Sequence, residues 1–462
     1  RPLWMAADLE RGAGQQFRGA VQLPPPAGLA RTPNPEEAAR TAGRITGEEA
    51  RRLGIDWVLA PVLDLDVEPE NPIVGTRSFG ADPEAVSRLG TAWIDGCQGT
   101  GVAACAKHFP GHGRTTADSH LECPRVDADR DLLKRQDLAP FRAAAPAVAS
   151  MMTAHVAYTR LTHRRDPAPA TLNREIVSGL LRGSMGYEGL VVTDALVMEG
   201  LGGAEEDEGE LVARAVRAGC DLFLYPRDLE TAVDALARLV DAGDPEITER
   251  IRESRQRSRR TRRRYVRGEG KGGWGPAGAL RPPGGGASGA AEKEGSGDAG
   301  GVGAEERVRE ALRLAVSSVT AVGNGDPAAA LDPARPLRVH AVSDDLERAG
   351  EEAPFGASVV RELKALGWTA ELAPGEDPAA DGQRLVLLRS TPQADKGRAS
   401  VSPERARGVL ELLDAAGPAA LVVFGHERLL RDLGRPGLCA WSSEDVMQRA
   451  AARALAGRVR GG

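Results

Sequence analysis

The first half of the chain alternates short apolar runs with stretches whose apolar residues recur at helical spacing. The apolar runs predict six buried strands, at residues 3–7, 57–65, 101–106, 150–156, 189–193 and 221–225. Helices are predicted between them, for example at residues 35–53 and 83–98. This alternation favours a parallel sheet and a TIM-type (β/α)8-like barrel with a weak or missing strand. A doubly wound sheet is the alternative, but it would need a glycine-rich phosphate-binding loop after a strand, and we find none.

The composition changes between residues 268 and 303, where Gly, Pro, Ala and Ser dominate. Such a segment predicts a flexible linker. Globular patterning then resumes with an amphipathic helix at 304–319 and apolar strands at 335–342, 383–390 and 419–425. The chain is therefore predicted to contain a barrel domain (1–267), a linker (268–303) and a smaller C-terminal α/β sandwich domain (304–462).

The most reactive stretch of the sequence is KHFPGHGRTTADSH, from Lys107 to His120. Lys107 and His108 fall at the end of the predicted strand 101–106, where parallel α/β proteins bind ligands. The glycines that follow predict a loop, and its far end carries Asp118 and His120. Because a carboxylate can orient an imidazole and tune its basicity, Asp118 and His120 are predicted to form a general acid/base pair.

A metal site is the alternative interpretation of this stretch, because five of the seven histidines lie between residues 108 and 163. The spacing of His108, His112 and His120 matches no helical ligand pattern, and Lys107 would place a positive charge beside the metal. We therefore expect no metal. The alternative predicts a hydrolase that loses its activity to chelators.

KHFPGHG followed by DSH resembles the signature of family 3 glycoside hydrolases, in the β-N-acetylhexosaminidase branch. Further motifs fit the family's order, namely APVLD, RSFG, MTAHV, PATLN and VVTDALVMEG. The resemblance covers residues 1–265 or so. It implies a TIM-type barrel, and the family's usual strand before residues 3–7 would be missing. The end of the chain, WSSEDVMQRAAARAL, loosely resembles the close of the family's second domain.

The resemblance also implies a retaining reaction that passes through a covalent glycosyl-enzyme. Asp194 in VVTDALVMEG would be the nucleophile, and His120, oriented by Asp118, would act as acid/base in place of a second carboxylate. The sugar would be bound by Asp8, Arg77, Lys107 and His108. The substrate would carry terminal β-linked N-acetylglucosamine, as in fragments of peptidoglycan or chitin, and no metal or organic cofactor is needed.

Several alternatives stay open from the sequence. Considered singly, Arg77 could form a structural salt bridge within its own loop, and Asp194 could cap a helix. A phosphorylase or a β-glucosidase of the same family would use a closely related site. An inactive sugar-binding protein is the alternative of another class, because Gln16 stands where the family has an Arg.

The composition of the chain limits which classes of partner and which cellular compartment we expect. With 27% charged residues and a net charge of -6, the chain lacks the basic excess that nucleic acid requires, and its Arg-rich run at 252–267 is interpreted as a solvated helix face or a domain exit. Its five scattered cysteines include no C-x-x-C pair, which favours a reducing, cytoplasmic location. Because the chain opens at Arg1, a removed leader or a truncated gene remains an alternative. No apolar run is long enough to predict a membrane span, and the oligomeric state is not predicted.

Overall fold

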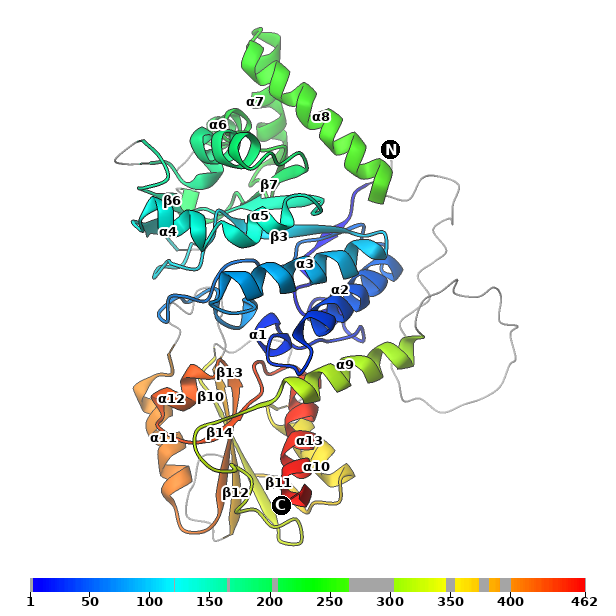
Figure 1. The fold of residues 1–462 in the computed structure, drawn as a ribbon, viewed down its shortest axis with the longest axis vertical. Coiled ribbons are helices and arrows are strands. Elements are labelled where there is room, and N and C mark those ends of the chain that lie inside the picture. Colours follow the sequence, from blue (N-terminus) through cyan, green and yellow to red (C-terminus); the bar gives the residue numbers. More distant parts are fainter. Residues whose placement is uncertain are drawn as a thin grey trace, which may run out of the picture.

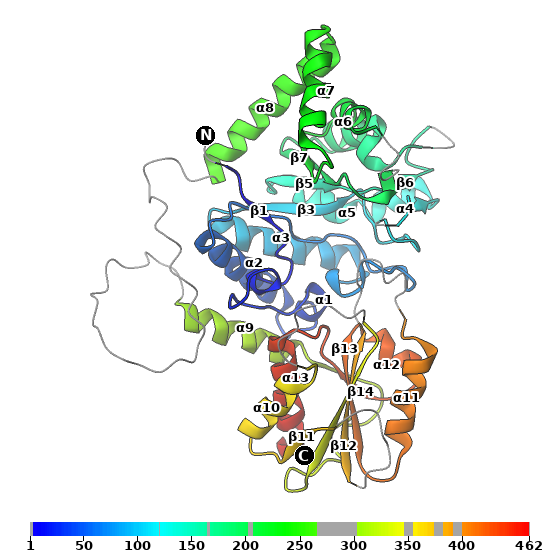
Figure 2. The ribbon, with the colours of Figure 1, turned by 180° about the vertical axis from the view of Figure 1, so that it is seen from behind.

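The computed structural model contains two α/β regions stacked along the long axis of the molecule (Figures 1 and 2). It describes residues 3–119, 121–163, 167–201, 207–265, 303–345, 354–373, 382–390 and 400–461. We call residues 3–265 the first region and residues 303–461 the second region. The predicted linker lies outside the described residues except for Gly303, so the predicted domain boundaries stay predictions.

The first region is built on a curled parallel sheet of six strands, in the order β1-β2-β3-β5-β7-β8. These strands are β1 (Ala6–Ala7), β2 (Trp57–Val58), β3 (Ala103–Phe109), β5 (Ser150–Thr153), β7 (Leu190–Ala195) and β8 (Leu222–Leu224). A separate short pair joins β4 (Arg125–Val126) to β6 (Ala157–Tyr158). The predicted α/β barrel class is therefore confirmed, in the form of a half-barrel.

Helices connect and cover these strands (Figure 1). They are α1 (Pro26–Leu29), α2 (Pro35–Arg52), α3 (Pro83–Gly99), α4 (Arg130–Arg135), α5 (Ala139–Ala144), η4 (Glu175–Ser184), α6 (Glu208–Ala218), α7 (Leu229–Asp241) and α8 (Pro245–Tyr265). Short 3-10 turns lie at Ala13–Gln15, Gly75–Arg77, Ala170–Leu172 and Glu199–Leu201. The predicted helices at 35–53 and 83–98 match α2 and α3 to within one residue at either end.

The central strands have continuous apolar runs because both of their faces are buried. Every residue of β3 is buried, and Leu190, Val191 and Val192 of β7 are wholly inaccessible. Outside the sheet, α2 and α3 pack closely at Gly43, Gly47 and Gly96. A Cβ at Gly43 would lie 2.1 Å from the Trp93 carbonyl oxygen, so only glycine permits this approach.

The second region has a six-stranded sheet with helices on both faces, which agrees with the predicted α/β sandwich (Figure 1). Its strands, in sheet order, are β11 (Ala370–Leu372), β10 (Leu337–Ser343), β12 (Gln383–Ser390), β13 (Ala419–Gly425), β14 (Gly437–Cys439) and β9 (Thr320–Val322). Only the β9 edge strand runs antiparallel to its neighbour. Its helices are α9 (Ala304–Ser318), α10 (Ala357–Ala365), α11 (Pro403–Asp414), α12 (Arg428–Asp432) and α13 (Asp445–Gly461).

Helix α9 lies between the two regions and belongs to both cores (Figures 1 and 2). Its Ala311 packs into the core of the first region, while Leu312 and Ala315 pack into that of the second. The buried Arg307 of α9 donates to Glu49 of α2 at 2.9 Å. The two regions therefore share apolar and ionic contacts.

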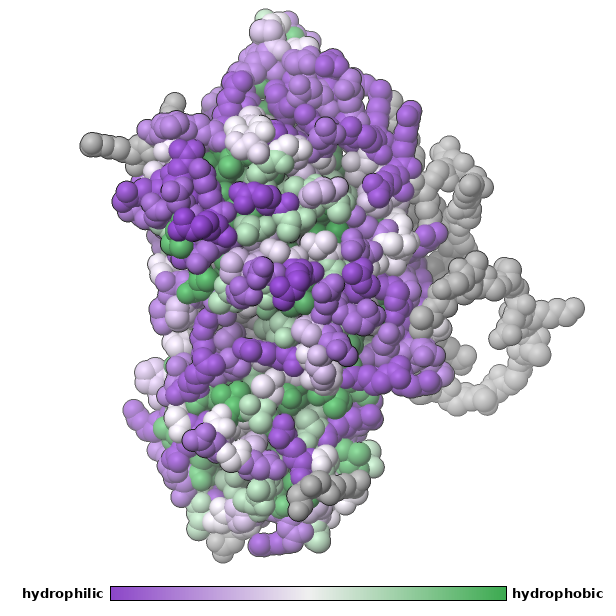
Figure 3. All heavy atoms as spheres, viewed as in Figure 1, coloured by the Kyte–Doolittle hydropathy of each residue, from purple (hydrophilic) through white to green (hydrophobic). Residues whose placement is uncertain are grey.

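Helix α8 contains most of the predicted Arg-rich run, and hydrophilic residues dominate the surface there (Figure 3). Arg252 pairs with Glu249 on the same helix, and Arg257 pairs with the buried Asp221 at 3.0 Å. The exposed Arg252–Glu249 pair fits the interpretation of the run as a solvated helix face, whereas Arg257 joins α8 to the buried Asp221. Among the described residues, no helix combines the length and apolar character needed to cross a bilayer.

Candidate active site

The predicted site residues of the first region lie at or just beyond the carboxyl ends of its strands. Asp8 directly follows β1, Lys107 and His108 lie in the last three residues of β3, and Asp194 is the penultimate residue of β7. Both of the latter strands extend further than predicted, so these side chains are anchored in the sheet itself. Because parallel strands have their carboxyl ends together, the fold brings these four residues to the same end of the sheet.

Lys107 is the centre of a buried ion network. It is only 3% exposed, and its Nζ lies 2.7 Å from a carboxylate oxygen of Asp8 and 2.7 Å from one of Glu10. Glu10 also accepts two hydrogen bonds from Arg77, at 2.9 Å to Nε and 2.8 Å to Nη2. The salt bridge of Arg77 is therefore to Glu10, which lies 67 positions earlier in the chain, and not to a partner within its own loop.

The charges of this network stabilise one another despite their burial. Burial by itself would raise the pKa of Glu10, but the neighbouring Arg77 and Lys107 lower that pKa well below its usual value. Burial would lower the pKa of Lys107, but Asp8 and Glu10 raise it above its usual value. Glu10 stays ionised and Lys107 stays protonated, so the network presents fixed charges to a ligand.

Asp64 organises the two histidines of the KHFPGHG stretch. One carboxylate oxygen lies 2.6 Å from Nδ1 of His108, and the other accepts backbone N–H groups from His108 at 3.2 Å and His112 at 2.7 Å. Burial lowers the pKa of His112 to about 4, so its imidazole is neutral near pH 7. Its two ring nitrogens contact the hydroxyls of Thr115 and Ser119 at 2.8 and 3.0 Å. His112 is therefore a structural residue of this loop.

Asp194 is partly exposed and held by its own strand. The backbone N–H of Ala195 donates to its carboxylate at 2.8 Å. Burial would raise the pKa of Asp194, but the charges of His108 and His155 outweigh that effect and lower it. His155 is buried two residues beyond β5, and its ring nitrogens contact Thr171 Oγ1 at 2.8 Å and the Ala195 carbonyl at 3.0 Å. Asp194 is therefore an ionised carboxylate on a backbone that β7 holds in place.

The loop that carries the predicted acid/base pair reaches the loop after β7. Asp118 is buried, and the next residue, Ser119, accepts a hydrogen bond from the backbone N–H of Gly200 at 3.1 Å. A Cβ at Gly200 would come within 2.7 Å of the Ser119 carbonyl, so this approach requires glycine. His120 lies outside the described residues, and its predicted role stays a prediction.

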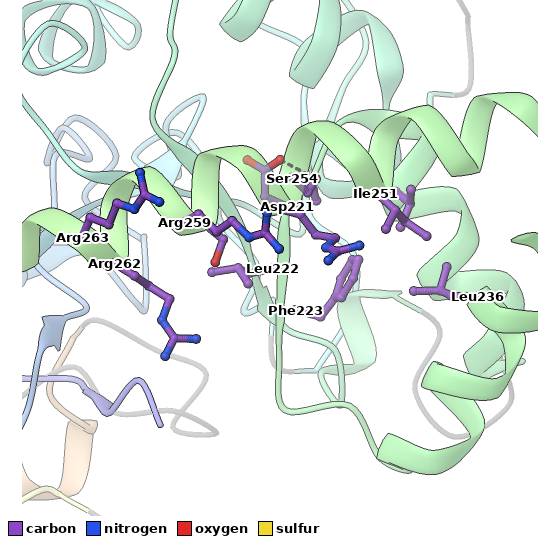
Figure 4. Close-up of a pocket in the computed structure, with 13 residues that line it drawn as sticks. Asp221, Leu222, Phe223, Leu236, Ile251, Ser254, Arg259, Arg262 and Arg263 are labelled. Atoms are coloured by element: carbon purple, nitrogen blue, oxygen red, sulfur yellow. Dashed lines mark hydrogen bonds between the residues drawn. The ribbon is translucent and has the colours of Figure 1, made fainter. Parts of the chain in front are cut away.

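The well-formed cavities lie away from these residues. One of about 560 Å³ opens between β8, α7 and α8, where apolar side chains such as Phe223 and Ile251 face arginines including Arg259 (Figure 4). Its buried carboxylate, Asp221, is already satisfied by Ser254 and Arg257 of α8 among others. This cavity shares no residue with the predicted site. The site is therefore defined by the charged residues at the carboxyl ends of the strands. Within the described ranges, no three His, Cys, Asp or Glu side chains are grouped as a metal site would require.

Comparison with known proteins identifies the family. The N-terminal domain of glycosyl hydrolase family 3 matches residues 1–260. The chain belongs to glycosyl hydrolase family 3. Its relatives include a β-hexosaminidase of Pseudomonas aeruginosa, 38% identical over 51% of this chain and 70% of that protein. A β-hexosaminidase of Alkalilimnicola ehrlichii is 40% identical over 53% of this chain and 70% of that protein.

A solved structure extends the similarity to the second region of this family 3 chain. The β-N-acetylglucosaminidase of Paenibacillus sp. str. FPU-7 superposes with a TM-score of 0.81 at 30% identity, covering 99% of this chain and 85% of that one. The similarity to glycosidases named for hexosamines confirms the predicted branch, and the prediction of a glycosidase is confirmed with it.

Two residues central to the network were absent from the predicted site. Glu10 and Asp64 are both buried carboxylates, each in contact with residues far along the chain. A signal was present for Glu10, because alternate residues of an extended segment share a face and Asp8 lies two positions before it. Asp64 follows an apolar run in the same manner as Asp194, and this position could have marked it.

Proposed function

We propose that this family 3 glycosidase is a retaining β-N-acetylhexosaminidase. It releases terminal β-linked N-acetylglucosamine from fragments of peptidoglycan or chitin. The confirmed family and branch support this proposal. The observation that carries it is the ionised Asp194 at the carboxyl end of β7, within the electrostatic influence of His108 and Lys107.

Asp194 supplies the nucleophile of the proposed reaction. Its carboxylate attacks the anomeric carbon, the bond to the leaving oxygen breaks, and His120 gives that oxygen its proton. His120, now neutral, then removes a proton from water, which attacks the glycosyl ester and frees the sugar. Asp194 returns as a carboxylate. A lowered pKa suits the first step, because only the ionised form of Asp194 attacks.

The Lys107 network binds the sugar in this proposal. Asp8 has a side chain that is 38% exposed, so it can accept sugar hydroxyls while Lys107 holds it. Arg77 is 27% exposed, and Glu10 fixes its direction through two hydrogen bonds. Fixed charges of this kind orient a substrate without a cost of rearrangement. His108, oriented by Asp64, completes the set.

Covalent trapping tests the proposed function. The purified chain should turn over a chromogenic N-acetylglucosaminide, and a mechanism-based fluorosugar should label the peptide that contains Val191 to Met198. A label on any other peptide would remove Asp194 from its role. A complete lack of turnover with intact sugar binding would favour the sugar-binding alternative.

A phosphorylase is the second candidate. The observation that favours it is the positive charge of Lys107, which acts on Asp194 across the site, together with an imidazole as predicted acid/base. A carboxylate in that place would repel an anionic acceptor, whereas neutral imidazole would not. Release of N-acetylglucosamine 1-phosphate in the presence of phosphate would identify this reaction, and release of the free sugar alone would identify hydrolysis.

A further inference from the structure

Three consecutive residues of the second region bind the first region. They are His426, Glu427 and Arg428, which follow β13 where that strand points toward the first region (Figure 1). Nε2 of His426 lies 3.0 Å from a carboxylate oxygen of Asp66, and Arg428 donates to the same oxygen at 2.7 Å. Glu427 accepts from Arg31 at 3.0 Å. Two hydrogen-bond donors of the second region therefore converge on a single carboxylate oxygen of the first.

The direction of His426 is fixed from both sides of its ring. The backbone N–H of Arg428 donates to Nδ1 at 3.1 Å, so Nε2 carries the proton that points at Asp66. The ring also packs edge-on against Trp441, with centroids 5.8 Å apart, and Trp441 is anchored by a 2.8 Å hydrogen bond to the Ser318 carbonyl. The second region thus presents a rigid donor.

Asp66 belongs to the segment that holds the active-site histidines. It is 7% exposed, and its backbone N–H donates to Gly80 at 2.9 Å. Two residues before it, Asp64 contacts Nδ1 of His108 and the backbone N–H groups of His108 and His112. Because these carboxylates are two residues apart in one segment, a displacement of Asp66 moves Asp64, and Asp64 moves His108.

We propose that His426 and Arg428 are positioning residues for the active site of the first region. By fixing Asp66 they fix Asp64, and through it the orientation of His108. This inference rests on the proposed function only in the role of His108 as a sugar-binding residue. The second region would then contribute to catalysis although none of its residues touches the substrate in this account.

The structure supplies a matched control for this inference. Arg44 of α2 pairs with Glu310 of α9 at 2.7 Å, so it also joins the two regions. Its described partners are Glu48 and Glu310, neither of which belongs to the segment of Asp64 and Asp66, so its loss weakens the interface without touching that segment. Arg44→Met and Arg428→Met both remove a guanidinium and keep most of the aliphatic stem, so they form a fair pair.

The test compares these variants in the full chain. Arg428→Met should lower kcat/KM for a chromogenic N-acetylglucosaminide by about tenfold, mostly through kcat, because a misplaced binding group costs transition-state stabilisation. Arg428→Lys, which retains the cation, should recover most of that loss. Arg44→Met should stay within about twofold of the unaltered chain. A similar loss in Arg44→Met, or no loss in Arg428→Met, would overturn the proposal.

A second readout does not depend on turnover. With ¹⁵N-labelled histidine, the Nδ1 resonance of His108 reports its hydrogen bond to Asp64. Arg428→Met should shift this resonance, and Arg44→Met should leave it in place. If the unaltered chain hydrolyses no aminosugar, the proposed function fails while this measurement still decides the positioning role. An unmoved His108 resonance in Arg428→Met would refute it.

Discussion

Each region contains a buried carboxylate that pairs with two cations. The difference between the two arrangements distinguishes a carboxylate that serves the active site from one that only stabilises the fold. Glu10 of the first region binds Lys107 of β3 and Arg77 of the 3-10 turn at Gly75–Arg77. Glu362 of the second region binds Arg449 and Arg453, which lie one turn apart on α13. Glu10 thus joins three separate segments, whereas Glu362 ties one helix to another.

The difference lies in how far the cations are removed from water. Lys107 is 3% exposed and Arg77 is 27% exposed, while the side chains of Arg449 and Arg453 are 31% and 42% exposed. Burying a charge is costly and is only partly offset by its partner, so a buried lysine such as Lys107 is a poor means of stabilising a fold. A half-exposed ion pair costs little desolvation energy and contributes little to the free energy of unfolding. The comparison suggests that the Glu10 network is retained for the chemistry of the site.

The largest expected effect tests whether the chemistry belongs to the first region alone. Asp194→Ala should lower turnover of a chromogenic N-acetylglucosaminide by about four orders of magnitude, because it removes the nucleophile. Asp445→Ala, which removes a carboxylate of the second region that pairs with the exposed Arg361, should leave turnover nearly unchanged. Near-normal activity of folded Asp194→Ala protein would contradict the assignment.

The next prediction concerns His120 as acid/base. His120→Ala should cost about two to four orders of magnitude on poor leaving groups, the usual size of a general-acid contribution. The cost should shrink for activated leaving groups, and azide should partly restore the rate by attacking the glycosyl-enzyme. Asp118→Asn should show a milder form of this behaviour. A loss that is equal for every leaving group and insensitive to azide would argue for a metal ligand instead.

The comparison of the two carboxylates can be tested directly. Glu10→Gln should lower kcat/KM about a hundredfold, because Lys107 and Arg77 lose their common anchor. It should also lower the free energy of unfolding by about 3 kcal/mol, since two cations lose a buried partner. Glu362→Gln should cost about 1 kcal/mol and leave kcat/KM unchanged. Urea unfolding and steady-state kinetics on both variants would measure this, and equal effects would erase the distinction.

The remaining prediction is a pH dependence of the free energy of unfolding that arises from the buried His112. Its pKa is lowered from 6.5 to about 4, so between these values the unfolded chain binds a proton that the folded chain does not. His112 therefore makes the free energy of unfolding fall as the pH falls from 6.5 to 4, by about 3 kcal/mol in all. Above pH 6.5 it contributes no slope.

His112→Gln should make this pH slope shallower, as measured by urea unfolding at several pH values. The matched control is His163→Gln, which removes an imidazole whose side chain is 82% exposed, and we expect it to keep the slope of the unaltered chain. If His112→Gln leaves the slope unchanged, the pKa of His112 is the same in the folded and the unfolded chain. Its imidazole is then not the buried neutral group described above.

Much of the fold could be predicted because its signals are local. The strands 383–390 and 419–425 are observed with the predicted bounds, as β12 and β13, since a buried parallel strand needs an uninterrupted apolar run. The predicted ends of strands were wrong where polar residues continue a strand. Lys107, His108 and Asp194 were expected after their strands but lie within them. Their side chains are satisfied there by Asp8, by Asp64 and by the Ala195 backbone N–H, respectively.

By itself the sequence determined the α/β class, the family, and the strand ends where Asp8, Lys107 and Asp194 meet. Only the tertiary structure decided what those residues touch. Glu10 reaches Arg77 across 67 positions, and Arg428 reaches Asp66 across 362. The physical reason is that apolar periodicity is set by neighbours in the chain, whereas the partner of a buried charge is set by which loops the packed sheets bring together.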